Sequence, residues 1–236
     1  MTPVEQIKSK IRTLGHHKKA VDAGRFFKTG PGQYGEGDVF IGLTVPEQRV
    51  VAKKHLDMTV AEVEELLQSP EHEFRLTALL IWDYQYAKSD AETRQAIFQT
   101  YLANTRWINN WDLVDSSASQ IVGPSLPNGD ISLLRKLAKS EFMWERRIAM
   151  VATFFFLGEG NPDPTIEIAT TLLNDQHDLM HKAVGWALRE MGKRCGREQL
   201  VKFLATHYRT MPRTALRYAI EHFSAEERQA YLKGTV

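Results

Sequence analysis

The stretch Leu179-Met-His-Lys-Ala-Val-Gly-Trp-Ala-Leu-Arg-Glu-Met191 places apolar residues at intervals of three and four, which predicts a helix with one apolar face. It opens with a basic residue directly before an alanine, Lys182-Ala183. Comparable openings occur at residues 73–78, 144–149 and 211–215. The four alanines, at positions 78, 149, 183 and 215, are separated by 71, 34 and 32 residues. The spacing indicates a repeated unit of about 35 residues, in which the copy over residues 107–120 lacks the alanine.

The same helical spacing of apolar residues covers most of the chain. It predicts helices over residues 60–67, 74–86, 93–102, 131–137, 144–157, 165–173, 179–191 and 198–208. Helix breakers separate these runs, at Ser69-Pro70, Gly123-Pro124, Pro127-Asn128-Gly129, residues 158–164 and Met211-Pro212. Strand alternation is hard to find. The sequence therefore predicts an all-α protein of helix pairs joined by short turns.

Repetition of helix pairs is typical of a solenoid. A unit of this length cannot bury its apolar face alone, so successive units stack on one another, and small residues allow the helices to approach closely. The inner helices of such a stack line a concave surface suited to an extended ligand, for example a nucleic-acid duplex. We therefore expect one helical-repeat solenoid domain over residues 1–236.

Composition narrows the class of protein further. The chain has 236 residues, 43% of them hydrophobic and 25% charged, which is typical of a soluble globular protein. A single cysteine, Cys195, excludes an internal disulfide framework and indicates a reducing compartment. No apolar run reaches the roughly 18 to 20 residues that span a bilayer, and the N-terminus lacks the apolar core of a signal peptide. We expect a cytoplasmic, monomeric protein without a membrane partner.

The chain lacks the common signatures of metal and nucleophilic catalysis. HExxH, GxSxG and SxxK are absent, and the eight histidines show no ligand spacing beyond the adjacent His16-His17. The glycines of residues 30–42 do not have the spacing of a phosphate-binding loop between a strand and a helix. We expect no metal and no cofactor.

Charge is distributed unevenly along the chain, although the net charge is only +1. Between Lys182 and Arg217 there are nine basic residues and two acidic ones, a net charge of +7, whereas residues 62–73 are acidic. A basic segment of this kind can attract a polyanion such as a phosphate backbone. A set of solvated helix faces explains the charge equally well.

Residues 28–42 interrupt the helical pattern with five glycines and a proline. We expect a glycine-rich loop insertion over residues 30–42, and a short hairpin at residues 34–40 is an alternative form of it. One use for such a segment is an arm that enters a DNA groove or contacts phosphates through backbone N–H groups. An ordinary insertion between helices is the alternative.

The segment Trp107-Ile-Asn-Asn-Trp111-Asp112-Leu-Val-Asp115 combines two indoles and two carboxylates. On a helix, Trp111 and Asp115 lie four residues apart and share one face. An indole beside a carboxylate suits a flat, positively charged ligand. Two ordinary interpretations remain open, because a tryptophan of a repeat is often a core residue and Asp115 before Ser116-Ser117 fits a helix N-cap.

Four motifs in order resemble the AlkD-type DNA alkylation repair family, and they cover most of the chain. These motifs are Gly42-Leu-Thr-Val-Pro46-Glu47-Gln-Arg49, Asn110-Trp111-Asp-Leu-Val-Asp115, Trp144-Glu-Arg-Arg147-Ile-Ala149 and Lys182-Ala-Val-Gly-Trp186-Ala-Leu-Arg189-Glu190. The resemblance implies a HEAT-repeat-like all-α fold. It also implies a DNA glycosylase that excises positively charged N3- or N7-alkylated purines from double-stranded DNA without a metal or a general acid.

The resemblance also implies roles for particular residues. Trp111 and Trp186 correspond to aromatic walls beside the lesion, Asp115 to the catalytic carboxylate, and Arg147 to a residue that contacts the DNA backbone. Arg147 could instead pair with Asp115 or a neighbouring acid and so join adjacent repeats. Further DNA contacts are expected from the basic segment, at Lys182, Arg189, Lys193 and Arg213.

The sequence departs from the family pattern at two positions near the N-terminus. The family has a tyrosine and a glutamine where this chain offers Phe26 and Thr44, and residues 30–42 resemble the added hairpin of branches that bind branched DNA without base excision. Two further functions therefore stay open. One is a non-catalytic binder of branched or damaged DNA, and the other is a protein-binding helical scaffold.

Overall fold

The computed structural model describes the backbone of residues 1–236 and every side chain except that of residue 128. Two compact units make up the chain, Met1–Ile121 and Val122–Val236. All regular elements in the described backbone are helices, and the one strand-like contact is an isolated bridge between Val39 and Glu71. The expected all-α class is confirmed, and the interpretation of residues 1–236 as a single domain stays a prediction.

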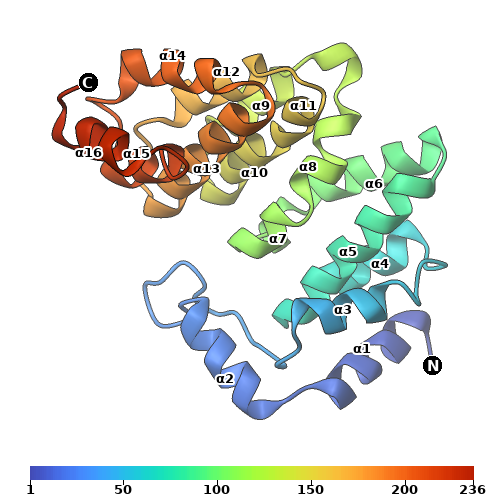
Figure 1. Ribbon diagram of the computed structural model, residues 1–236. Coiled ribbons are helices and arrows are strands. Elements are labelled where there is room, and N and C mark those ends of the chain that lie inside the picture. Colours follow the sequence, from blue (N-terminus) through green and yellow to red (C-terminus); the bar gives the residue numbers. More distant parts are fainter. The chain divides into compact units, whose positions relative to one another are not determined.

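The first unit is built around one buried helix, α5 (His72–Lys88), against which other helices of the unit pack (Figure 1). Its other helices are α1 (Pro3–Leu14), α2 (His17–Phe26), α3 (Val45–Ala52), α4 (Val60–Leu67), α6 (Ala91–Ala103), α7 (Trp111–Asp115) and α8 (Ala118–Ile121), with the 3-10 turn η1 (Thr105–Trp107). Each residue of α5 from His72 to Trp82 is buried, because α1, α3, α4, α7 and α8 all pack against it. This helix is therefore the core of the unit and the support of its loops.

The second unit is built around α13 (Asp178–Arg194), which packs against α10, α11, α12, α14 and α15 (Figure 1). Its remaining elements are η2 (Gly123–Ser125), η3 (Pro127–Gly129), α9 (Ser132–Leu137), α10 (Met143–Ala152), α11 (Phe154–Gly158), α12 (Asp163–Leu172), α14 (Arg197–His207), α15 (Arg213–Ala219) and α16 (Ala225–Lys233). None of the helices in the described residues of either unit combines the length and the apolar character needed to cross a membrane.

Small residues allow α13 and α15 to pack closely. The alanines of the repeated openings, Ala149, Ala183 and Ala215, are all buried. A Cβ atom built on Gly185 of α13 would lie 2.4 Å from the carbonyl oxygen of Ala215 and 2.5 Å from Cβ of Tyr218. The two backbones are therefore too close for any side chain at position 185.

Two ion pairs of the second unit have the spacing of the repeat. Arg135 of α9 pairs with Glu167 of α12, and Arg189 of α13 pairs with Glu221 after α15, both over 32 residues. This separation equals the distance between the alanines of the last two units. These two pairs therefore join equivalent positions of neighbouring units.

One expectation about secondary structure is wrong, and one alternative that the sequence left open is not observed. The helix expected over residues 144–157 is divided into α10 and α11 at Thr153, a buried residue whose hydroxyl donates to the carbonyl oxygen of Met150 at 2.7 Å. The short hairpin at residues 34–40 does not form, because the segment folds into successive turns that use positive φ angles at Gly32 and Gly37. The glycine-rich loop expected over residues 30–42 is confirmed.

Candidate functional site

Helix α7 presents Trp111 and Asp115 on one face. The three residues between them are buried, whereas Trp111 and Asp115 at the two ends are both partly exposed. The expected four-residue spacing on a helix is therefore confirmed. Asp115 is the last residue of the helix, so the interpretation of it as an N-cap is wrong. The N-cap is Asn110, whose Oδ1 accepts a hydrogen bond from the backbone N–H of Trp111 at 2.8 Å.

A buried tyrosine lies within the electrostatic reach of Asp115. Tyr101 of α6 is fully buried, and its hydroxyl lies 3.0 Å from Oγ of Ser117. Burial raises the pKa of Tyr101; the hydrogen bond to Ser117 opposes this rise, and the charge of Asp115 adds to it. Tyr101 therefore stays a neutral hydroxyl beside the end of α7.

Aromatic side chains from α2 and the following loop hold the indole of Trp111. The ring of Phe27 is stacked on it, with centroids 5.2 Å apart and planes at 19°, and Phe26 meets it edge-on at 5.8 Å. Phe26 itself is 65% exposed. Phe27 continues the stack on its other side to Phe40, at 5.0 Å. Trp111 is thus one end of an aromatic cluster whose outer member, Phe26, faces solvent.

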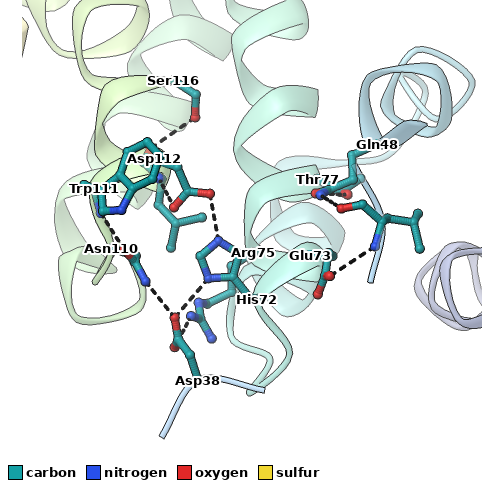
Figure 2. Close-up of polar contacts among 12 residues, drawn as sticks. Asp38, Gln48, His72, Glu73, Arg75, Thr77, Asn110, Trp111, Asp112 and Ser116 are labelled. Carbon is teal, nitrogen blue, oxygen red and sulfur yellow. Dashed lines mark hydrogen bonds and ion pairs between the residues drawn. The ribbon is translucent and has the colours of Figure 1, made fainter. Parts of the chain in front are cut away.

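A buried histidine joins the loop to α7 (Figure 2). The Nδ1 atom of His72 lies 2.9 Å from Oδ2 of Asp38, and its Nε2 atom lies 2.8 Å from Oδ2 of Asp112. Burial acts to lower the pKa of His72, but the charge of Asp112 and the hydrogen bonds to both carboxylates outweigh it and raise the pKa to about 9. The ring is therefore an imidazolium whose two N–H groups donate to two carboxylates.

Asp38 is the centre of this buried polar cluster. Besides His72, it accepts hydrogen bonds from Nη2 of Arg75 at 2.5 Å and from Nδ2 of Asn110 at 3.0 Å (Figure 2). Burial acts to raise the pKa of Asp38, but the His72 hydrogen bond and the Arg75 charge outweigh it and lower the pKa. With Asp112, the cluster pairs two cations with two carboxylates, so its charges balance.

The far end of the loop is fixed by another buried carboxylate, outside this cluster. Glu73 of α5 accepts hydrogen bonds from the backbone N–H groups of Ile41, Gly42 and Leu43 at 2.9, 2.7 and 3.2 Å. Gly42 has a φ of +94°, and a Cβ atom there would lie 2.2 Å from the carbonyl oxygen of His16. Glycine is therefore required at this position.

The two positions at which the sequence departs from the family pattern have defined roles here. Thr44 is the N-cap of α3, and its N–H and its hydroxyl both donate to Oε2 of Glu47 at 2.7 Å. Phe26 supplies an exposed ring at the edge of Trp111 and no hydroxyl group. Thr44 therefore caps helix α3, and Phe26 packs in the aromatic cluster around Trp111.

The other expected site residues belong to the second unit. Trp186 of α13 is partly exposed and meets the ring of Phe154 edge-on at 4.5 Å. Arg147 of α10 is only 5% exposed, and its Nη1 donates to the carbonyl oxygen of Leu179 at 2.8 Å, which ties α10 to α13. Trp186 thus has an accessible surface, whereas Arg147 has a contact within the protein.

The four basic residues expected at DNA differ in their surroundings. Lys182 pairs with Asp178 at 2.8 Å, and Arg189 pairs with Glu221 and Glu190. Lys193 and Arg213 are exposed, at the end of α13 and the start of α15 respectively. Lys193 and Arg213 are therefore the more accessible charges of this set.

The structure brings together Trp111 and Asp115 in the first unit, and it adds residues to them that the sequence did not single out: Phe27, Asp38, His72 and Arg75. Asn110 and Asp112 were predicted only as members of the motif around Trp111, with no role of their own. Among the described side chains, no three His, Cys, Asp or Glu residues are grouped so as to hold a metal ion. The cluster is built for pairing within the protein.

Comparison with known proteins matches the chain to a family model and to solved structures. The family model described as DNA alkylation repair enzyme matches residues 7–223. A solved structure described as "Predicted DNA alkylation repair enzyme from Enterococcus faecalis" superposes with a TM-score of 0.68 at 18% sequence identity, over 89% of this chain and 97% of that one. No curated protein matches the chain. At this identity the solved structure shows a shared helical-repeat fold.

Proposed function

Because the chain belongs to the DNA alkylation repair enzyme family, we propose that it is a monofunctional DNA glycosylase for positively charged alkylated purines in double-stranded DNA. The observation that carries the proposal is the pairing on α7 of a partly exposed indole, Trp111, with a partly exposed carboxylate, Asp115. An indole favours a cationic base, and a carboxylate favours the charge that appears on the sugar.

The reaction does not require a protein group that protonates the departing base. A purine alkylated at N3 or N7 already carries a positive charge, so the base leaves as a neutral molecule and needs no general acid. As the N-glycosidic bond lengthens, positive charge moves to the deoxyribose. A nearby carboxylate stabilises this oxocarbenium character and orients the water that attacks the sugar. Asp115 is the proposed group for both tasks.

The remaining roles follow from the resemblance and from exposure. Trp111 and Trp186 are the proposed aromatic walls, and a cation over an indole contributes about 0.5 to 2 kcal/mol. Lys193 and Arg213 are the proposed main phosphate contacts, since both are exposed. Lys182 and Arg189 are proposed as weaker contacts because each already has a carboxylate partner. Arg147 is proposed to contact the DNA backbone near the lesion, while its hydrogen bond to Leu179 joins α10 to α13.

Release of N7-methylguanine and N3-methyladenine from methylated duplex DNA tests the proposal. We expect the wild-type protein to release both bases, and Asp115→Asn to lose at least 100-fold in single-turnover rate, about the loss seen when one transition-state charge partner is removed. Asp57→Asn is the matched control, because Asp57 is exposed in a loop before α4. Full activity in Asp115→Asn, or no release by the wild-type protein in excess over DNA, would reject the proposal.

Binding of damaged or branched DNA without base excision is the second candidate. It is favoured by Phe26, which has no hydroxyl group, and by Thr44, whose hydroxyl is engaged with Glu47. Under this function the wild-type protein releases no base, yet binds a four-way junction more tightly than a duplex of the same length. Equal affinity for the two DNAs would count against it.

A further inference from the structure

We propose that Asp38, His72 and Asp112 are positioning residues that fix Trp111, so that the glycine-rich loop sets the aromatic wall of the site. Together with Arg75 and Asn110, these residues are called the Asp38 clamp. The consequence for base excision rests on the proposed function, whereas the effect on the position of Trp111 does not.

The first step of the argument is the small size of α7. The helix has five residues, Trp111–Asp115. A helix this short cannot stabilise itself, because nucleation costs more than a few hydrogen bonds return. Its position must therefore come from the groups that hold its ends.

The second step is that the Asp38 clamp holds α7 at two points. Asp38 accepts a hydrogen bond from Nδ2 of Asn110 at 3.0 Å. The Oδ1 atom of the same amide group accepts a hydrogen bond from the backbone N–H of Trp111 at 2.8 Å. His72 binds Asp112, the residue after Trp111, at 2.8 Å (Figure 2). The backbone on both sides of Trp111 is therefore tied to one carboxylate and one imidazole.

The third step concerns the ring of Trp111. Phe27 is stacked on Trp111 and also contacts His72 at 5.0 Å, and Phe40 is stacked on His72 at 4.6 Å. Phe27 and Phe40 flank the glycine-rich loop and also stack on each other at 5.0 Å, so the two rings and the imidazolium are in mutual contact and together support the indole. Both the backbone and the ring of Trp111 thus depend on residues 27–40.

The fourth step separates positioning from plain stability. Four buried charges cost desolvation, and replacing such a cluster by apolar residues is often neutral or stabilising. What a charged, fully paired cluster supplies is a single geometry, because only one arrangement satisfies every donor and acceptor. For a site that must meet a lesion, this fixed geometry is the useful property.

The fluorescence of Trp111 tests the position directly. It is obtained as the difference between the spectra of a protein and the same protein carrying Trp111→Phe. We expect Asp38→Asn to shift this emission to longer wavelength and to increase its quenching by acrylamide, because the indole is no longer held in the stack. Glu36→Gln is the matched control, since Glu36 lies in the same loop and its carboxylate accepts a hydrogen bond from the N–H of Gly32 at 2.8 Å, outside the Asp38 clamp.

A second variant keeps the test valid if Asp38→Asn fails to fold. Asn110→Ser retains an N-cap side chain and so retains the helix cap, but serine is too short to reach Asp38. We expect the same change in Trp111 emission with unchanged helix content by circular dichroism. Unchanged emission and quenching in folded Asn110→Ser would overturn the proposal, whatever the result for Asp38→Asn.

Base excision gives the last measurement. We expect Asp38→Asn and Asn110→Ser to reduce the single-turnover rate of N7-methylguanine release by about 10- to 100-fold, the loss typical of a displaced site group, while the Kd for DNA changes less than about twofold. Full excision by both variants would overturn the positioning role. If the wild-type protein releases no base, the proposed function fails, and the emission of Trp111 still decides whether the Asp38 clamp positions it.

Discussion

The Nε2 atom of His72 lies 2.8 Å from the carboxylate of Asp112, a residue 40 positions later in the chain. The first residue of α5 therefore binds the second residue of α7 inside the first unit. Because His72 also donates to Asp38, a single imidazolium connects the core helix, the glycine-rich loop and the helix that carries Trp111. A change in its charge affects all three elements together.

The stability of the protein should depend on pH through His72. The groups that face its ring are Asp38 from the loop, Asp112 from α7 and Arg75 from its own helix. The pKa of His72 is raised to about 9 in the folded protein from 6.5. Its stabilising contribution is therefore complete below about pH 6.5 and is lost as the pH rises through about 9.

Thermal melting between pH 6 and pH 10 measures this effect. We expect the Tm of the wild-type protein to fall over that range, and the fall to be smaller in His72→Gln, which has no proton to lose. His222→Gln is the control, because His222 is exposed after α15. If the wild-type and His72→Gln curves run parallel, His72 does not carry the pH dependence.

Gly185→Ala should destabilise the second unit. Alanine in place of glycine normally favours a helix by about 1 kcal/mol. Here the added Cβ atom would lie 2.4 Å from the carbonyl oxygen of Ala215, so α13 and α15 must separate. We expect a net loss of about 1 to 3 kcal/mol in the free energy of unfolding, the usual cost of overpacking, measured by urea denaturation.

Gly158→Ala is the matched control for this prediction. A Cβ atom at Gly158, the last residue of α11, meets no atom within 4 Å. We expect this variant to be unchanged or slightly more stable. If Gly185→Ala proves as stable as Gly158→Ala, then the two helices tolerate a larger separation than their packing indicates.

Removal of exposed positive charge should weaken DNA binding in a salt-dependent way. Lys193→Gln and Arg213→Gln each remove a proposed phosphate contact, so the slope of log K against log salt concentration should become less steep by about 1 for each charge. Binding titrations between 50 and 200 mM salt measure the slope, in the range where phosphate contacts dominate. Lys233→Gln, exposed at the end of α16, is the control. A slope that stays the same in both variants would remove these residues from the DNA surface.

A hydroxyl group at position 26 should raise base excision. Phe26 meets Trp111 edge-on and is largely exposed, so Phe26→Tyr places a new hydrogen-bonding group beside the indole. One added hydrogen bond contributes about 0.5 to 1.5 kcal/mol, which corresponds to a gain of roughly 2- to 12-fold in the rate of release. Phe142→Tyr, at another exposed phenylalanine, should leave the rate unchanged. A loss of activity in Phe26→Tyr would argue that the apolar ring itself is required.

Local patterns in the sequence predicted those features that depend on local spacing. The interval of four between Trp111 and Asp115 predicted their shared face, and apolar spacing predicted both ends of α4, Val60–Leu67. Helices α1, α2 and α3 were missed, since their apolar residues are few and are mixed with charged ones. The break at Thr153 was missed because the apolar spacing continues through it.

The Asp38 clamp could not be predicted, because its members are distant in the sequence. His72 is 34 residues from Asp38, and Asn110 is 72 residues from it. These residues meet because α5 is buried in the first unit. Short-range patterns in the sequence do not predict such long-range contacts. The sequence left a short hairpin open at residues 34–40, but the segment forms turns, and Asp38 at the end of these turns belongs to the buried polar cluster.

The attachment of Glu73 to three consecutive backbone N–H groups has a practical consequence for protein engineering. Glu73 holds the main chain at Ile41, Gly42 and Leu43, and the hydrogen bonds of Asp38 hold the loop a few residues earlier. Gly32, which is exposed and where a Cβ atom meets nothing within 4 Å, precedes both attachments and is therefore a place to insert an epitope or a dye-labelling peptide. Doubling the length of a flexible loop costs only about 0.6 kcal/mol, so an insertion there should leave both attachments intact.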